Sequence, residues 1–234
     1  MAKRKAELTN LERFGGGIFF VLYLLLLPLA AKPALRLAGR KLGQAVTEGM
    51  ISAVYYYGLF AVTVILFHTL LSRTTRRFLD APGRALQTAG IGLVAHYGLC
   101  ELAGRLGSLF LSRGVNLNNS AIASQIGNAP HMTLLIVVFL APFVEETLFR
   151  GLVFGGLRER SRVLAYGASC LLFALLHVWQ FAIANRDLSY FLLMAPYLIP
   201  GLVLAWAYDH SGTLWASIGL HAGVNALSLL SGLV

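Results

Sequence analysis

Apolar segments of roughly membrane-spanning length alternate along this sequence with short connections in which basic residues gather. A transmembrane helix needs about 20 mostly apolar residues, and such helices are expected at residues 16–31, 50–71, 85–111, 132–157, 163–184, 188–208 and from 213 onward. Only 12% of the residues are charged, about half the share of a soluble domain. A net charge of +9 would suggest nucleic acid in a soluble protein, but basic residues between apolar segments are typical of membrane topology. We therefore predict an all-α, polytopic transmembrane helix bundle that has no nucleic-acid partner.

The number of spans and their orientation follow from the basic connections. We expect about seven to eight spans in one integral-membrane domain over residues 1–234, with N-terminal spans in 1–129 and the polar motifs in 130–234. We expect a cytoplasmic N-terminus, because the basic residues near it and those after the second and fourth segments then all lie on the cytoplasmic side. Residues 32–49 do not fit this orientation, because their four basic side chains would lie on the external side. They would fit if this segment is an interfacial helix or if an eighth span exists. The polar residues 112–131 suit an external loop.

Two adjacent glutamates and an arginine interrupt the apolar segment at residues 132–157. Carboxylates at membrane depth are costly, at about 2.5–3.5 kcal/mol each on insertion scales, and by default they mark a functional site. Glu146 and Arg150 are four residues apart with the acid first, which favours an ion pair. This pair would leave Glu145 as the carboxylate without a partner on its own helix. Pro142 would start or kink the helix and free backbone carbonyls that must be buried or face water, so we expect a polar intramembrane cavity here.

Two later segments carry further polar side chains at helical spacing. Phe173 and His177 are four residues apart in one segment, and His221 and Asn225 are four residues apart in the last. A single membrane histidine is more often an interhelical hydrogen-bonding group than a catalyst. A carboxylate and two imidazoles that converge from three helices, however, form a constellation that can activate water.

Three motifs follow one another along the chain: Glu145-Glu146-x-x-x-Arg150, Phe173-x-x-x-His177 and His221-x-x-x-Asn225. Together they resemble the CAAX-protease and bacteriocin-processing family, also called the Abi family. The resemblance covers about residues 130–234. It implies a membrane-embedded endopeptidase similar to the type II enzymes that remove the last three residues from prenylated CAAX proteins, with a lipidated or membrane-associated polypeptide as substrate.

The resemblance also assigns roles by position. Glu145 would be the general base, His177 would help to hold the attacking water, and His221 with Asn225 would stabilise the oxyanion. The supporting residues would be Glu146, Arg150 and Phe173. The chemistry agrees with this assignment, because a carboxylate in a low-dielectric cavity is a stronger base when ionised. An amide, in turn, can donate to an oxyanion without titrating.

A zinc site is an alternative use of the same side chains. Two histidines and a glutamate with an open fourth position suit a catalytic zinc, which would make Glu145, His177 and His221 its ligands. We favour a reaction without metal or cofactor, because neither helix carries a closely spaced ligand pair and Asn225 is a poor zinc ligand. A second alternative is a non-enzymatic membrane transporter or immunity protein that uses these residues as a relay, although the sequence lacks the related halves typical of transporters.

Overall fold

All regular structure in the described part of the chain is helical. The computed structural model describes residues 8–41, 43, 46–108, 122, 126–127 and 129–231, without the side chains of 107 and 108, and these ranges contain no strand. The all-α fold class is confirmed. The loop predicted over residues 112–131 and the basic residues before residue 8 lie largely outside the described ranges.

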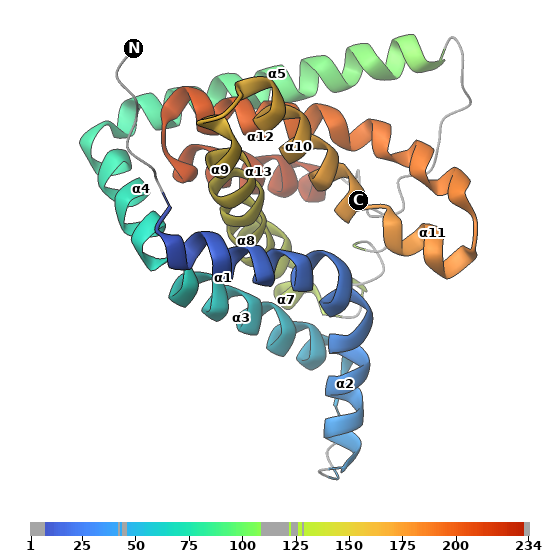
Figure 1. Ribbon diagram of the computed structural model, residues 1–234. Helices are drawn as coiled ribbons and strands as arrows, with labels where there is room; N and C mark the ends of the chain where they lie inside the picture. The colour runs from blue at the N-terminus through green and yellow to red at the C-terminus, as the bar shows by residue number, and fades with distance from the viewer. Residues whose placement is uncertain are drawn as a thin grey trace.

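Figure 1 shows how the helices are arranged. In chain order the α-helices, π-helical turns (η1 to η3) and one 3-10 helix (η4) are α1 (Asn10–Val21), η1 (Leu22–Leu26), α2 (Leu27–Lys41), α3 (Glu48–Leu66), α4 (His68–Asp80), α5 (Pro82–Ser108), α7 (Pro130–Leu135), η2 (Ile136–Leu140), α8 (Ala141–Glu146), η3 (Thr147–Phe154), α9 (Gly155–Arg158), α10 (Arg162–Leu176), α11 (Trp179–Asn185), η4 (Leu188–Met194), α12 (Ala195–Ser211) and α13 (Leu214–Leu230).

Within the described ranges, four helices are long and apolar enough to cross a membrane: Asn10–Lys41, Glu48–Leu66, Pro130–Arg158 and Leu188–Ser211. The bent pair of α10 and α11 makes a fifth if it is one broken span. α13 is apolar but shorter, and α5 is long but does not meet the same test. Where the structure describes them, the predicted segments are helical, although 50–71 extends over α3 and α4 and 163–184 over α10 and α11. Four or five of the described helices qualify as spans by length and composition. The chain is an integral membrane protein.

The first long helix reaches further than predicted. A capping box starts it, in which the Glu12 amide donates to the Thr9 hydroxyl oxygen and the Thr9 amide donates to the Glu12 carboxylate. α1, η1 and α2 then run on without a break to Lys41. Residues 32–41, for which an interfacial helix or an eighth span was an alternative, continue this helix, and α2 projects away from the other helices (Figure 1).

The basic residues that follow the second predicted segment lie on the helix α4 and not in a short connection. Its buried residues Leu70 and Thr74 face the bundle, whereas Arg73 and Arg76 are exposed, so α4 is amphipathic. The buried Glu12 carboxylate of α1 accepts a hydrogen bond from the Leu70 backbone N–H at 2.7 Å. This contact satisfies a free amide in the first turn of α4, whose own N-cap side chain makes no such bond. A long-range cap therefore explains a helix that the local sequence does not predict.

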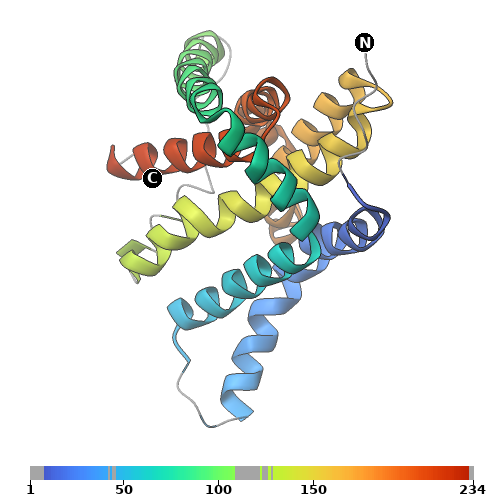
Figure 2. The same ribbon diagram turned by 90° about the vertical axis from the view of Figure 1, so that its left-hand side faces the viewer.

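The helix that carries the glutamates lies at the centre of the molecule. In its most apolar window 67% of the residues are buried, against 17–28% in the other three candidate spans. Figure 2 shows this helix, from α7 to α9, passing between the N-terminal and C-terminal helices, with α4 crossing in front of it. The predicted span at 132–157 is confirmed, but η2 and η3 on either side of α8 are π-helical. π-helical turns are rare in proteins overall, but those that occur often lie at functional sites.

The predicted fifth segment is broken at His177. The His177 ring donates through Nδ1 to the Phe173 carbonyl at 2.8 Å, and that carbonyl is the acceptor a continuing α-helix would offer to the His177 backbone N–H. The backbone N–H bonds instead to the Ala174 carbonyl at 3.2 Å. The helix therefore tightens and ends, and α11 leaves at an angle of 41°.

The sixth segment contains two prolines, and its helix continues past both of them. Pro196 lies in the first turn of α12, where a missing N–H leaves no helical bond unmade. Pro200 lies inside α12 without ending it. The next residue, Gly201, allows α12 to approach α10 closely, because a Cβ there would lie 3.3 Å from the Cα of Cys170.

Candidate active site

Glu146 and Arg150 form the predicted ion pair, and the pair is fully buried. Arg150 Nη1 lies 3.0 Å from Glu146 Oε1, and both side chains are 0% exposed. Arg150 Nη2 donates to the Gly201 carbonyl of α12 at 3.0 Å, and the guanidinium carbon lies 4.4 Å from the centroid of the Phe173 ring. A carboxylate, a carbonyl and a ring face thus stabilise the charge where water is absent. The ion pair expected from the sequence spacing is confirmed.

Glu146 also binds His221, a contact that the sequence did not predict. His221 Nδ1 lies 2.9 Å from Glu146 Oε1. An ionised carboxylate only accepts hydrogen bonds, so Nδ1 carries the proton and Nε2 is the ring nitrogen left for another partner. Glu146 thereby fixes the orientation of the imidazole, as the acidic residue does in a hydrolytic triad.

Glu145 and His221 face each other across a short gap. Glu145 Oε2 lies 4.0 Å from His221 Nε2, and Glu145 Oε1 lies 3.5 Å from the hydroxyl of Tyr23. Both Glu145 and His221 are buried to 8% exposure. A separation of 4.0 Å is too long for a direct hydrogen bond, but a single water at about 2.8 Å from each atom can bind both. The structure therefore brings Glu145, Glu146 and His221 into one polar group.

His177 lies beside this group rather than within it. Its ring centroid is 4.7 Å from that of Phe173 and 4.5 Å from that of Tyr197, on which it stacks at 24°. The Phe173 ring also meets His221 edge-on at 5.8 Å. The Phe173 ring thus contacts both histidines and lies between them. Because His177 Nδ1 is bound to the Phe173 carbonyl, Nε2 is the nitrogen that can take another partner.

Asn225 binds a carbonyl that Pro142 leaves free. In η2 the Ala141 N–H bonds five residues back to the Ile136 carbonyl. The next bond in this register would run from residue 142 to the Val137 carbonyl, but proline has no N–H. Asn225 Nδ2 donates to that carbonyl at 2.8 Å instead. The free carbonyl expected from Pro142 is therefore present, and one amide hydrogen of Asn225 is engaged by it.

The alternative zinc ligands do not form a ligand set in this arrangement. Among the described residues, no three His, Cys, Asp or Glu side chains are placed to hold a metal ion together. Glu145 and His221 approach one another, but His177 packs between two aromatic rings. We therefore derive no step through a metal.

Tyr23 and Tyr197 were missed in the sequence. Tyr23 comes from the first long helix and Tyr197 from the start of α12, and each reaches a polar residue of another helix. Neither has a polar neighbour at helical spacing that would have drawn attention to it. Contacts of this kind depend on how helices pack and leave no pattern in the sequence.

Comparisons with known proteins identify the C-terminal part of the chain. Residues 127–227 match the family model described as type II CAAX prenyl endopeptidase Rce1-like. The chain is 22% identical over 184 residues to "Putative membrane peptidase YdiL" of Bacillus subtilis (strain 168), which covers 78% of this chain and 71% of that protein. It is 35% identical over 101 residues to an "Uncharacterized 24.3 kDa protein" of Escherichia coli, which covers 43% of this chain and 44% of that protein.

A third relative is the UPF0177 protein YxdF of Lactococcus lactis subsp. lactis (strain IL1403), with 32% identity over 90 residues, or 38% of this chain and 44% of that protein. The matched stretch thus spans less than half of two of the three relatives. No solved structure matches the chain. The three motifs all fall within residues 127–227, the part of the chain that matches this family model. The match supports the resemblance to the CAAX-protease and bacteriocin-processing family that the motifs indicate.

Proposed function

We propose that the protein is an intramembrane endopeptidase in which Glu145 activates water to hydrolyse a peptide bond. One observation carries the proposal: Glu145 Oε2 and His221 Nε2 face each other at 4.0 Å, while Glu146 holds the other side of His221. The family match and the relative named as a membrane peptidase support the reaction class.

The proposed reaction uses Glu145 as base and then as acid. The water oxygen attacks the carbonyl carbon of the substrate while its proton passes to the Glu145 carboxylate. The same proton then moves to the leaving nitrogen as the carbon–nitrogen bond breaks, which regenerates the carboxylate. The motif resemblance assigns His177 to holding the water. Its ring lies beside the Glu145–His221 pair, in contact with Phe173 and Tyr197, so this role requires a movement of the His177 side chain.

The negative charge that develops on the carbonyl oxygen needs donors. His221 supplies one through Nε2–H when its ring carries both protons, and the Glu146 contact keeps the ring aimed at the same place. Asn225 has a second amide hydrogen besides the one bound to the Val137 carbonyl, and this hydrogen is the candidate second donor.

The substrate would be a membrane-associated polypeptide. The site lies in the most buried of the candidate spans, so a peptide must reach it from within the bilayer or at its surface. The family description supports a polypeptide with a prenylated C-terminus as the first substrate to test.

The test is cleavage of quenched fluorescent peptides by protein reconstituted in vesicles. Matched peptides with and without a prenylated C-terminal cysteine motif separate the two substrate classes. We expect wild type to cleave and Glu145→Gln to lose at least a hundredfold in turnover while keeping its melting temperature. Turnover at the wild-type rate in a folded Glu145→Gln protein would remove Glu145 as the base.

A chelator arm in the same assay tests the zinc alternative. A metal-free mechanism predicts unchanged turnover after treatment with chelator and no gain on adding zinc. Loss of activity on chelation and its return with zinc would instead favour Glu145, His177 and His221 as ligands after a rearrangement.

A further inference from the structure

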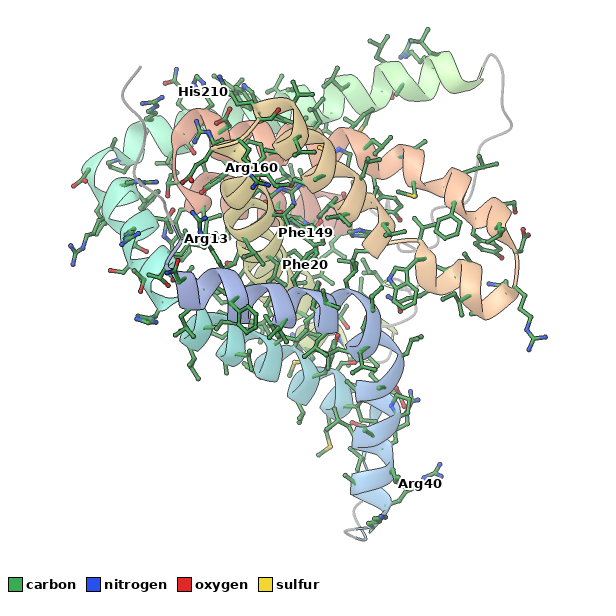
Figure 3. All side chains as sticks on the ribbon, in the orientation of Figure 1. Arg13, Phe20, Arg40, Phe149, Arg160 and His210 are labelled. Carbon is green, nitrogen blue, oxygen red and sulfur yellow. The ribbon has the colours of Figure 1, made fainter. Side chains whose placement is uncertain are left out.

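The N-terminal half of the chain contacts the candidate active site, although the family match begins only at residue 127. Phe20 of α1 packs edge-on against Phe149 of η3, with ring centroids 5.3 Å apart. Figure 3 labels both rings, which meet where α1 passes the central helix. Tyr23, one turn further along, is 5% exposed, and its hydroxyl lies 3.5 Å from Glu145 Oε1. A side chain from outside the matched stretch therefore reaches the proposed base.

The local sequence explains why α1 comes so close. A Cβ at Gly16 would lie 2.6 Å from the Phe67 ring and 3.3 Å from the Leu152 side chain, so this approach requires glycine. Tyr23 follows in the π-helical turn η1, in which the Leu27 N–H bonds back to the Leu22 carbonyl. A π-helical turn rotates the side chains relative to an α-helix, and such turns are frequent at functional sites. Close approach and local rotation together bring the Tyr23 hydroxyl to Glu145.

The two oxygens of Glu145 consequently have different surroundings. Oε2 faces His221 at 4.0 Å, and Oε1 faces the Tyr23 hydroxyl. A phenol that meets an ionised carboxylate donates its proton. Hydrogen bonds in an active site without substrate are often long and tighten in the reacting complex. A donor on Oε1 holds the carboxylate plane so that Oε2 points toward the water.

Resting on the proposed function, we infer that Tyr23 is a positioning residue for the general base Glu145, so that the catalytic centre includes the N-terminal half of the chain. The groups that face Glu145 come from five elements and include two further hydroxyls within electrostatic range. They are Tyr23, Tyr55, Tyr56, Glu146, Arg150 and His221.

The test compares Tyr23→Phe with wild type in the vesicle assay. Phenylalanine keeps the ring and removes only the hydroxyl. We expect kcat to fall about 10-fold with KM unchanged, because one hydrogen bond to a charged group is lost while no substrate contact changes. The acid limb of the kcat/KM profile should move to higher pH, because the ionised carboxylate loses a stabilising donor. A purely structural role would leave that limb in place.

The matched control is Tyr57→Phe, which removes a hydroxyl from a tyrosine that is 48% exposed and should behave as wild type. A Tyr23→Phe protein with the kcat and the pH profile of wild type overturns the inference, as does a fall in kcat that follows a lowered melting temperature with no change in the pH profile. Glu145→Gln assayed in parallel separates the two hypotheses. If wild type cleaves and Glu145→Gln does not, an unaltered Tyr23→Phe protein rejects only the role of Tyr23. If Glu145→Gln also cleaves, the proposed base is wrong.

Discussion

Glu146 has two partners, and removing its charge should affect both. Glu146→Gln leaves Arg150 buried without its counter-charge, and breaking such a pair costs about 3–5 kcal/mol. The substitution also disturbs the acceptor that orients His221. We therefore expect a lower melting temperature together with a loss of turnover that persists at temperatures where the variant is folded.

The control for Glu146→Gln is Glu101→Gln, because Glu101 and Arg105 form an ion pair with the same spacing at the surface. Arg105 lies 2.8 Å from Glu101, but these side chains are 79% and 66% exposed. Because exposed pairs contribute about 0–1 kcal/mol, Glu101→Gln should change stability little. Similar melting temperatures for the two variants would show that Arg150 gains its stability from the Gly201 carbonyl and the Phe173 ring rather than from Glu146.

Asn225 combines a structural bond with a proposed catalytic one, and a second substitution can separate them. Asn225→Ala leaves the Val137 carbonyl without its donor, at a cost of about 1–3 kcal/mol. If the other amide hydrogen binds the oxyanion, kcat should also fall by about 10²–10³. Pro142→Ala restores a backbone N–H in the register that points to Val137. In that background the loss of stability should shrink while the loss of kcat remains.

The test measures melting temperature and kcat for wild type, Asn225→Ala, Pro142→Ala and the double variant. Recovery of both quantities in the double variant would mean that Asn225 acts only by joining α13 to η2. A loss of kcat that Pro142→Ala cannot repair would support the oxyanion role.

At the scale of elements, α4 holds the start of the helix that carries His221. The Leu214 N–H donates to the Thr74 hydroxyl oxygen at 2.6 Å, and the Thr213 hydroxyl donates to the Thr74 carbonyl at 2.9 Å. The Trp215 indole N–H donates to the Thr75 hydroxyl oxygen at 2.9 Å. His221 lies about two turns further along α13. These contacts from α4 thus anchor the start of α13.

Thr74→Val tests this coupling. The isosteric side chain leaves the buried Leu214 N–H unpaired, which should lower stability by about 1–3 kcal/mol. Because the start of α13 loses an anchor, we also expect turnover to fall several-fold in the folded protein. Thr74→Ser keeps the hydroxyl and should retain both properties. Wild-type turnover in Thr74→Val would show that α13 is fixed by its other contacts.

At the scale of the whole molecule, basic residues gather at one end. Arg13 at the start of α1 pairs with Glu159 at 3.6 Å, and Arg84 at the start of α5 donates to the His210 carbonyl at 2.8 Å. Figure 3 shows Arg13, Arg160 and His210 in one region of the molecule and Arg40 at the far end of α2. We propose that the Arg13 end faces the cytoplasm, in keeping with the positive-inside rule.

The basic segment at residues 32–41, which does not fit a cytoplasmic N-terminus, has one of its charges paired. Arg36 donates through Nε and Nη2 to the Glu48 carboxylate, at 2.9 and 2.7 Å, so one of its charges is paired across to α3. The positive-inside rule counts Lys and Arg whether or not they are paired, so residues 32–41 still favour the opposite orientation and a direct test is needed.

Thiol labelling can test the orientation. In a background where Cys100 and Cys170 are serine, Arg160→Cys should react with an impermeant reagent only after cells are permeabilised. Arg40→Cys should react in intact cells. The reverse pattern would place the N-terminus outside.

The sequence predicted contacts within helices better than contacts between them. The Glu146–Arg150 pair and the Phe173–His177 contact follow from a spacing of four residues, because such residues are neighbours on any helix. The Glu146–His221 bond joins two helices whose packing no local pattern encodes. The helix α4 escaped prediction because Glu12 caps it from 58 positions away in the sequence.

The π-helical turns could not be predicted for a related reason. They depend on partners elsewhere in the fold, as when Asn225 takes the place of the N–H that Pro142 lacks. The proline alone indicated that a carbonyl would be free. It could not indicate that the register would change around Glu145 or which side chain would bind the carbonyl.

The close fit at Gly151 limits how this chain can be recombined with its relatives. A Cβ there would lie 2.7 Å from the end of the Leu70 side chain of α4, so a larger residue at position 151 would require Leu70 to move. In a chimera that joins the C-terminal half of this protein to the N-terminal half of a relative, we expect stability to be higher when α4 is transplanted with the C-terminal half. The start of the family-model match at residue 127 is therefore not a boundary of packing, and the similarity to the Bacillus subtilis protein extends beyond it.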